Sequence, residues 1–186
     1  MTYYLYTPDG QEISHHNLQD KGFWCENGKS QEEAFVEKFG NKIGLIINPE
    51  KKNNPYAPDL LNTRNNILGD LKTQNTPFFK AQKLYGLSPQ FTVVFNKKDK
   101  ERYETYYSNL EIYFAVDWQV TKFEQNGNTI EVNPMQGIWF IPFLKLSGLL
   151  TKSPLHSYQQ RVQDQKGNAK SSYLLNLLDQ EFIRII

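Results

Sequence analysis

Two aspartates and a lysine gather in one stretch of the sequence, between Pro58 and Thr73. Asp59 directly follows the proline, and Asp70 and Lys72 are two positions apart within an apolar run. Two carboxylates that converge repel each other and are hard to keep ionised unless a cation lies between them. Magnesium, or manganese in its place, suits such a pair because it takes hard oxygen ligands and completes its shell with water and substrate phosphate. The chemistry open to this set is metal-assisted phosphodiester hydrolysis, in which Lys72 orients water or stabilises developing negative charge.

The residues around these side chains predict a β-hairpin that would position them. Residues 56–61 lead into one strand, Ile67 to Lys72 form the next, and the pair Asn65-Asn66 is typical of the turn between them. Alternate residues of a strand share a face, so Asp70 and Lys72 point to the same side. The hairpin can therefore bring both carboxylates and the ammonium group together.

A helix is predicted ahead of this hairpin. Ser30 and Glu33 have the spacing of a capping box, in which a serine side chain caps the helix and a glutamate reaches back. Phe35 and Phe39 are four residues apart and should face the core, and Gly40 should end the helix. Residues 43–47 form a compact apolar run with three β-branched isoleucines, so a buried strand should follow before the hairpin begins.

The order of helix, buried strand and hairpin, with Pro58-Asp59 followed by Asp70-Leu71-Lys72, resembles the PD-(D/E)XK nuclease superfamily. The resemblance covers about residues 30–95. It implies a restriction-endonuclease-like fold, with Asp59 and Asp70 as metal ligands and Lys72 as the catalytic lysine.

The same resemblance implies a further glutamate near the metal, contributed by the preceding helix. Glu33 is the candidate, with Glu37 or Glu32 as substitutes. The capping box explains Glu33 equally well, and both roles can coexist.

Similar letter patterns occur elsewhere in the chain. Pro8-Asp9 is a second proline–aspartate pair, and Glu50 with Lys52 and Asp164 with Lys166 repeat the acid-x-lysine spacing. Each of these copies lies in polar or turn-like sequence. The copy at Asp70 is the one preceded by a helix, a buried strand and a proline–aspartate pair.

The rest of the chain predicts one α/β domain, residues 1–186, with a mixed central β-sheet flanked by helices. We expect a nuclease-like core over about residues 30–120 and a C-terminal β/α extension over about residues 121–186. A hairpin that turns at Asn126-Gly127 should extend the sheet. Further helices are expected over 78–84, 97–107 and 171–183, and further strands over 91–95, 111–120, 129–132 and 137–143.

Composition limits the classes of partner. The chain has 186 residues, a net charge of +1 and one cysteine, Cys25. Overall charge therefore supplies no field for nucleic acid, and contacts to phosphate would need a local basic face. Cys25 cannot form an internal disulfide, and the neighbouring His15 and His16 would point apart in a strand, so these residues indicate no metal or nucleophile site. The candidate phosphate-contacting residues are Lys51, Lys52, Lys97, Lys98, Lys100 and Arg102.

The expectation from the sequence is a cytoplasmic, magnesium-dependent nuclease that acts on DNA, since no signal peptide or membrane span is evident. A homodimer is plausible for a chain of this size, because two copies can cut two strands. The alternative is a non-catalytic nucleic-acid- or protein-binding module that keeps the fold and the hairpin for packing.

Overall fold

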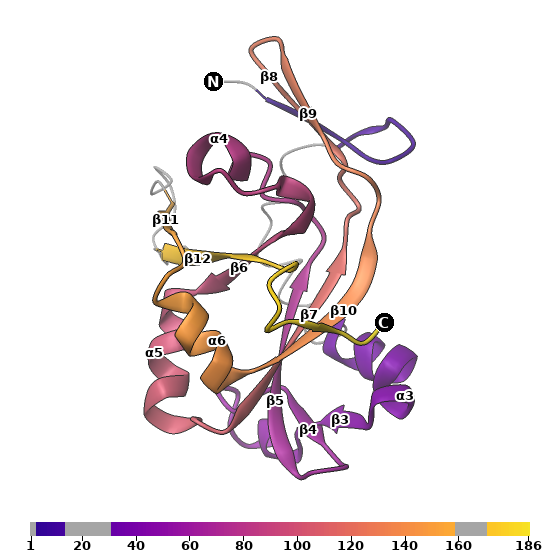
Figure 1. The fold of residues 1–186 in the computed structure, drawn as a ribbon. Helices are drawn as coiled ribbons and strands as arrows, with labels where there is room; N and C mark the ends of the chain where they lie inside the picture. Colours follow the sequence, from indigo (N-terminus) through magenta and orange to yellow (C-terminus); the bar gives the residue numbers. More distant parts are fainter. Residues whose placement is uncertain (1–2, 14–30, 159–170) are drawn as a thin grey trace.

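The computed structural model of the chain describes residues 3–13, 31–158 and 171–186 (Figure 1). It contains helices together with three β-sheets, so the expected mixed α/β class with a mixed central sheet is confirmed. Within the described ranges, no helix has the length and apolar character needed to cross a bilayer.

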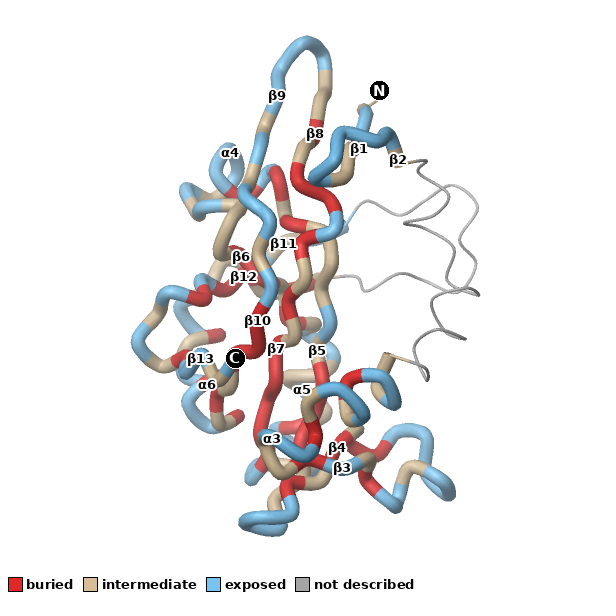
Figure 2. The backbone as a smooth tube through the Cα atoms, turned by 90° about the vertical axis from the view of Figure 1, so that its right-hand side faces the viewer, coloured by how far each residue is buried: buried red, intermediate tan, exposed pale blue. Residues whose placement is uncertain are grey.

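The central sheet has six strands in the order β13-β10-β7-β5-β4-β3. Neighbouring strands run antiparallel, except that β5 and β7 are parallel and are joined by a long crossover. Figure 2 shows that the middle strands of this sheet are the most deeply buried part of the molecule. In chain order the strands are β3 (Leu45–Ile47), β4 (Leu60–Asn62), β5 (Ile67–Gln74), β7 (Leu110–Asp117), β10 (Gln136–Pro142) and β13 (Ile183–Arg184).

The predicted hairpin is present as β4 and β5. The strands pair from Leu60 opposite Gly69 to Asn62 opposite Ile67. Asn66 in the turn has a φ of 59°, a left-handed conformation that asparagine tolerates better than most residues. Local turn chemistry and the apolar pattern of the strands therefore agree on this hairpin.

A helical segment covers one face of the central sheet. Residues 31–35 are helical and continue into a π-helical turn, η1 (Val36–Gly40), and a short α3 (Asn41–Ile43). Phe35 packs on the sheet with Leu71 and Tyr113, as expected for its helix face. The helix ends later than predicted, at Gly44, which has a φ of 77°. Gly40 is instead a packing position, since a Cβ there would meet the Leu45 carbonyl oxygen at 2.5 Å.

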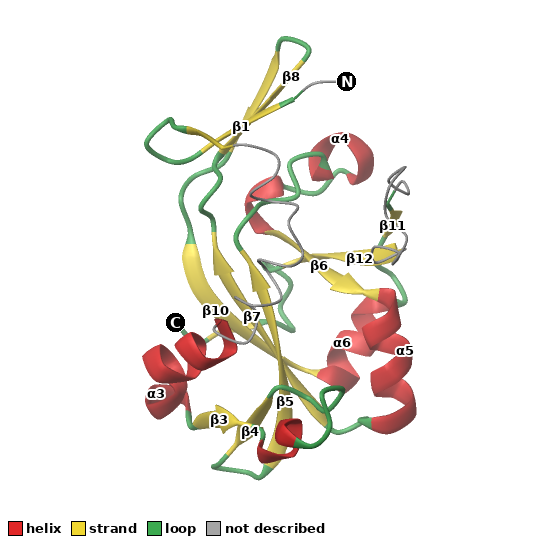
Figure 3. Cartoon of the chain, turned by 180° about the vertical axis from the view of Figure 1, so that it is seen from behind, coloured by secondary structure: helices red, strands yellow, loops and turns green. Residues whose placement is uncertain are grey.

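The opposite face is covered by two helices and a three-stranded sheet, as Figure 3 shows from behind. Phe95 and Tyr103 from this layer pack with Ile112 and Phe114 of β7. These side chains belong to one hydrophobic core cluster, which also includes buried residues of α6. The elements are β6 (Thr92–Asn96), α5 (Lys97–Tyr106), α6 (Phe143–Leu150), β11 (Leu155–Ser157) and β12 (Ser171–Asn176), with short 3-10 turns η2 (Pro49–Lys52) and η3 (Pro89–Phe91) in the connections.

A separate four-stranded sheet lies at one end of the molecule (Figure 1). The predicted hairpin at Asn126-Gly127 is present, but it pairs with the N-terminal strands and does not extend the central sheet. Leu5 of β1 lies opposite Phe123 of β8, and both are buried. The order is β2-β1-β8-β9, with β1 (Tyr4–Tyr6), β2 (Glu12–Ile13), β8 (Lys122–Gln125) and β9 (Asn128–Glu131).

Two predicted helices are wrong in extent or type. The segment over 171–183 is not a helix, because its first half is strand β12, paired antiparallel with β6. The Asn176 and Asp179 side chains then accept hydrogen bonds from main-chain N–H groups two residues on, a turn geometry that competes with helix. The helix expected over 78–84 is limited to α4 (Ala81–Tyr85), although it does end at Gly86 as predicted.

Candidate functional site

Asp59 and Asp70 meet where the hairpin strands separate. The last strand pair before the separation is Leu60 opposite Gly69, so Asp59 and Asp70 occupy the next position along the two strands. The Asp59 carboxylate turns toward β5 and its Oδ2 accepts a hydrogen bond of 3.1 Å from the Leu71 N–H. The Asp59 side chain thus accepts the hydrogen bond that a main-chain carbonyl of a neighbouring strand would otherwise accept, and this contact holds its carboxylate beside Asp70.

Lys72 lies on the same face of β5 as Asp70, as the sequence predicts. Its Nζ is 2.6 Å from Asp70 Oδ2 and 2.6 Å from Asp99 Oδ2, so the ammonium group is shared between carboxylates of strand β5 and helix α5. The group also lies over the rings of Phe95 and Tyr103, at 5.5 and 5.6 Å from their centroids. Lys72 is therefore held in one place by two carboxylates and two aromatic faces.

A second lysine reaches the same region from the loop before the hairpin. Lys51 forms an ion pair with Asp59, and its Nζ is 3.0 Å from Glu32 Oε1. Glu32 comes from the start of the helical segment, whereas the candidate Glu33 is exposed to solvent. The helix thus does supply a glutamate to this region, but the structure brings in Glu32 and leaves Glu33 and Glu37 exposed. The proposed cap Ser30 lies outside the described residues.

We call these side chains the charged cluster. Two of its ion pairs lie within one element: Lys72 with Asp70 on β5, and Arg102 Nη2 with Asp99 Oδ1 at 3.3 Å on α5. The others join groups on different segments. The cluster holds one more carboxylate than cations when all groups are ionised. Its members are Glu32, Asp59, Asp70 and Asp99 with Lys51, Lys72 and Arg102.

Burial decides how the centre of the cluster titrates. Removal from water raises the pKa of the Asp70 carboxyl, and nearby Asp59 adds to the increase, although Lys72 opposes it. Burial alone would lower the pKa of Lys72, but the surrounding negative charges of Asp70 and Asp99 raise it overall. Lys72 thus stays protonated, while an ionised Asp70 is costly without more positive charge nearby.

Asp70 Oδ2 also lacks a hydrogen bond of normal geometry from any described residue, although it has the ion-pair contact to Lys72. A buried carboxylate oxygen with unused acceptor capacity is the kind of group that a hard cation satisfies. Asp59 and Asp70 together fit a magnesium or manganese ion in their chemistry. Among the described residues, however, no three His, Cys, Asp or Glu side chains gather as a preformed metal site, so water and substrate would have to complete the shell.

Another buried carboxylate, Glu111 on β7, shows what a structural acid looks like in this sheet. Its Oε2 accepts hydrogen bonds from Asn62 at 2.9 Å and from the Tyr113 hydroxyl at 2.5 Å, and its Oε1 accepts one from Asn65 at 2.8 Å. Both oxygens are therefore satisfied by neutral donors. Glu111 stabilises the hairpin turn from the other face of the sheet, with a hydrogen-bond donor on each of its oxygens.

The basic residues on α5 are mostly engaged with acids of the same helix. Lys97 lies 3.7 Å from Glu101, Lys100 lies 2.6 Å from Glu104, and Arg102 pairs with Asp99. Lys98 and Lys52 are exposed. The predicted basic face is thus not a continuous positive surface, and Lys51 and Arg102 are the members of the set that belong to the charged cluster.

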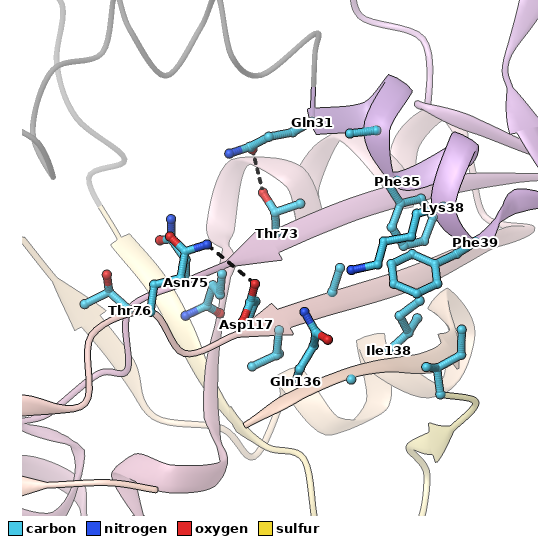
Figure 4. Close-up of a pocket in the computed structure, with 17 residues that line it drawn as sticks. Gln31, Phe35, Lys38, Phe39, Thr73, Asn75, Thr76, Asp117, Gln136 and Ile138 are labelled. Atoms are coloured by element: carbon cyan, nitrogen blue, oxygen red, sulfur yellow. Dashed lines mark hydrogen bonds between the residues drawn. The ribbon is translucent and has the colours of Figure 1, made fainter. Parts of the chain in front are cut away.

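A groove of about 670 Å³ lies on the opposite side of β5, between the helical segment and the ends of the central strands (Figure 4). Phe39 and Ile138 contribute apolar surface to it, and Asn75 and Gln136 contribute amides. Thr73, the residue after Lys72, lies at its rim, and its hydroxyl donates a hydrogen bond of 3.2 Å to Gln31 Oε1. Nothing in the sequence pattern indicated this groove, because its walls come from segments far apart in the chain.

Sequence reasoning also missed Asp99 and Tyr103, whereas Glu32 had been named as a substitute for Glu33. Asp99 stands among the lysines of a charged helix, and this sequence context predicts a solvent-exposed side chain. One signal was available, because Asp99, Arg102 and Tyr103 are three and four residues apart and share a helix face. His15, His16 and Cys25 lie outside the described residues.

Comparison with known proteins adds no assignment, since no family model, no curated protein and no solved structure matches this chain.

Proposed function

We propose that this chain is a metal-dependent nuclease that hydrolyses phosphodiester bonds in DNA, using Mg²⁺ or Mn²⁺. The observation that carries the proposal is the buried Asp70 carboxylate, set next to Asp59 across the hairpin, with Lys72 on its own face and one oxygen without a hydrogen bond. Burial without full compensation costs stability, and proteins keep such groups where function needs them.

We further propose that the fold is restriction-endonuclease-like. Support comes from the order of elements around the site: a helical segment, strand β3, the hairpin β4–β5, and a crossover to the parallel strand β7. This is the order implied by the resemblance of Pro58-Asp59 and Asp70-Leu71-Lys72 to the nuclease superfamily. Fold alone does not define activity, so the proposal depends on the charged cluster.

The roles follow from the surroundings of each side chain. Asp59 and Asp70 would hold the cation, which would polarise the phosphodiester and activate a water molecule. Lys72 has a raised pKa and stays protonated, so it cannot serve as the general base. It would instead donate a hydrogen bond to a phosphate oxygen or to the attacking water and stabilise negative charge there. Glu32 holds Lys51 next to Asp59, where Lys51 can neutralise substrate phosphate.

Substrate would approach from the side of Lys51 and Asp59. The Asp70 side chain is only 4% exposed, whereas those of Lys51 and Glu32 are 21% and 25% exposed. β4 pairs with β5 only as far as Gly69, so the edge of β5 beyond Asp70 is not covered by that strand. We propose that a phosphate backbone reaches the buried carboxylate along this stretch of β5.

The test is cleavage of plasmid, linear and single-stranded DNA, and of RNA, with Mg²⁺, Mn²⁺ or a chelator. Wild type is compared with Asp70→Asn and Lys72→Met, and with Glu50→Gln, which alters a copy of the acid-x-lysine spacing away from the hairpin strands. We expect cleavage by wild type and Glu50→Gln and a much lower rate, measurable only at high enzyme concentration, in the other two variants. Equal activity in all four proteins would point to a contaminating nuclease and would end the proposal.

The second candidate is a non-catalytic binding module with the same fold. It is favoured by the ion pairs that Lys51 and Lys72 make with Asp59 and Asp70, which can be read as a self-contained charged core. Metal-independent DNA binding by wild type, without cleavage and unchanged in Asp70→Asn, would support this module. A homodimer is proposed only with the nuclease, and light scattering of the purified protein with and without DNA tests it.

A further inference from the structure

We propose that Asp99 is the positioning residue for Lys72: it keeps the ammonium group at the site when the Asp70 carboxylate turns to a cation. This inference rests on the proposed function, which it deepens by assigning a residue outside the hairpin. Asp99 lies on α5, in the layer that packs against the Asp70 face of the central sheet.

The geometry shows a shared ammonium group. Lys72 Nζ is equally close to Asp70 and Asp99, at 2.6 Å from one oxygen of each, and the contact to Asp99 is a hydrogen bond of normal geometry. The contact to Asp70 is an ion pair in which Asp70 Oδ2 gains no such hydrogen bond. Asp99 is therefore the better hydrogen-bond partner of Lys72.

A cation bound by Asp59 and Asp70 would compete with Lys72 for the Asp70 oxygens. Lys72 would then retain its hydrogen bond to Asp99, and among the described residues its other hydrogen-bond acceptor is the Tyr103 hydroxyl at 3.5 Å. Without Asp99, the long and flexible Lys72 side chain would have one weak hydrogen-bond partner and would sample many rotamers. Asp99 prevents this loss of position.

Asp99 is itself fixed. It stands in the first turn of α5, where negative charge is favoured by the helix dipole, and Arg102 Nη2 lies 3.3 Å from its second oxygen. Arg102 also donates a hydrogen bond of 2.6 Å to Tyr103. One carboxylate oxygen thus faces Lys72 and the other faces Arg102, so the orientation of Asp99 is set from both sides.

The first test measures Lys72 without relying on activity. Lysine acylation is followed by peptide mass spectrometry in wild type, Asp99→Ala, Asp99→Asn and Glu101→Ala, each with and without Mg²⁺. Glu101→Ala is the matched control, because it removes an exposed partner of Lys97 from the same helix. We expect Lys72 to stay protected in wild type and Glu101→Ala, and to become several-fold more reactive in both Asp99 variants once Mg²⁺ is added.

The second test is a double-mutant cycle on cleavage. Asp99→Ala should lower kcat by roughly 10 to 100-fold with little change in KM, on the order of the loss that follows from misplacing a reacting group. Adding Asp99→Ala to Lys72→Met should cause no further loss, because a positioning residue acts through the group it holds.

Two results overturn the inference: Lys72 equally protected in wild type and the Asp99 variants, or an equal loss from Asp99→Ala with and without Lys72. Circular dichroism checks that each variant folds, and Asp99→Asn, which keeps the side-chain size, carries the test if Asp99→Ala does not fold. Changed Lys72 protection in a protein without nuclease activity would sustain the positioning role and reject the proposed function.

Discussion

Asp70 and Glu111 are buried carboxylates on neighbouring strands of the central sheet, but they face opposite sides and differ in how they are satisfied. Asp70 is 3% exposed and Glu111 is 7% exposed, so burial does not separate them. Glu111 is surrounded by neutral donors, whereas Asp70 faces Lys72 and retains an oxygen without a hydrogen bond. This contrast distinguishes a structural acid from a candidate ligand.

The contrast predicts opposite effects of two isosteric changes on stability. Asp70→Asn should raise the free energy of unfolding by about 1 kcal/mol, because it removes a poorly compensated buried charge while Lys72 keeps Asp99. Glu111→Gln should lower it by about 1 to 3 kcal/mol, because an amide NH₂ would then face donors. Urea denaturation in the presence of a chelator measures both. A loss of stability in Asp70→Asn as large as that in Glu111→Gln would contradict the functional interpretation of Asp70.

The raised pKa of Asp70 predicts how stability depends on pH without metal. Its pKa in the folded protein lies above the ordinary value of about 3.9, so between these two values the folded state keeps a proton that the unfolded state releases. The contribution of Asp70 is therefore full in acid and is lost as pH rises through the folded pKa. The Asp70→Asn variant should show a smaller decline over this window when unfolding is measured from pH 4 upward. Parallel curves for the two proteins would contradict the raised pKa.

A cation that binds Asp59 and Asp70 should stabilise the fold. At a free concentration of 100 times its Kd, Mg²⁺ should increase the free energy of unfolding by about 2.7 kcal/mol, because it binds the folded state alone. Thermal unfolding with increasing Mg²⁺ measures the effect, and isothermal titration calorimetry gives the Kd. Asp70→Asn should abolish the shift, and Glu33→Gln should preserve it because Glu33 is exposed. An equal shift in Asp70→Asn would place the ion elsewhere.

The two neighbouring glutamates of the helical segment should separate in function. Glu32→Gln weakens the hold on Lys51, whose Nζ is 3.0 Å from Glu32 Oε1, and should reduce kcat/KM for DNA cleavage about tenfold if one charge-assisted hydrogen bond is lost. Glu33→Gln should leave cleavage unchanged, since that side chain points to solvent. Steady-state cleavage of one oligonucleotide by both variants is the measurement. The reverse order of effects would restore Glu33 as the assisting acid.

Much of the fold follows from short-range pattern. The apolar run at Ile67 to Lys72 and the turn at Asn65-Asn66 define the hairpin, and the spacing of Asp70 and Lys72 places them on one face of its second strand. The C-terminal end of the first helix was predicted less well. Gly40 is required for close packing against Leu45, and the helical segment ends at Gly44.

The segment after Ser171 shows where local pattern fails. Its leucines suit an amphipathic helix, and Leu174 and Leu177 are buried as that pattern requires. Leu178, however, is exposed, and residues 171–176 pair with β6 as a strand. The edge of a sheet formed by distant residues therefore determined that this segment is a strand and not a helix. Propensity is a weak influence where tertiary pairing offers hydrogen bonds and burial together.

The sequence by itself determined that Asp59, Asp70 and Lys72 stand on one hairpin, because strand alternation and turn chemistry act over a few residues. Only the tertiary structure decided which charges surround them. Asp99 arrives on a helix after the hairpin, and Glu32 on a helix before it. These contacts depend on how helices dock across the two faces of the sheet, and docking is set by the packing of the whole core.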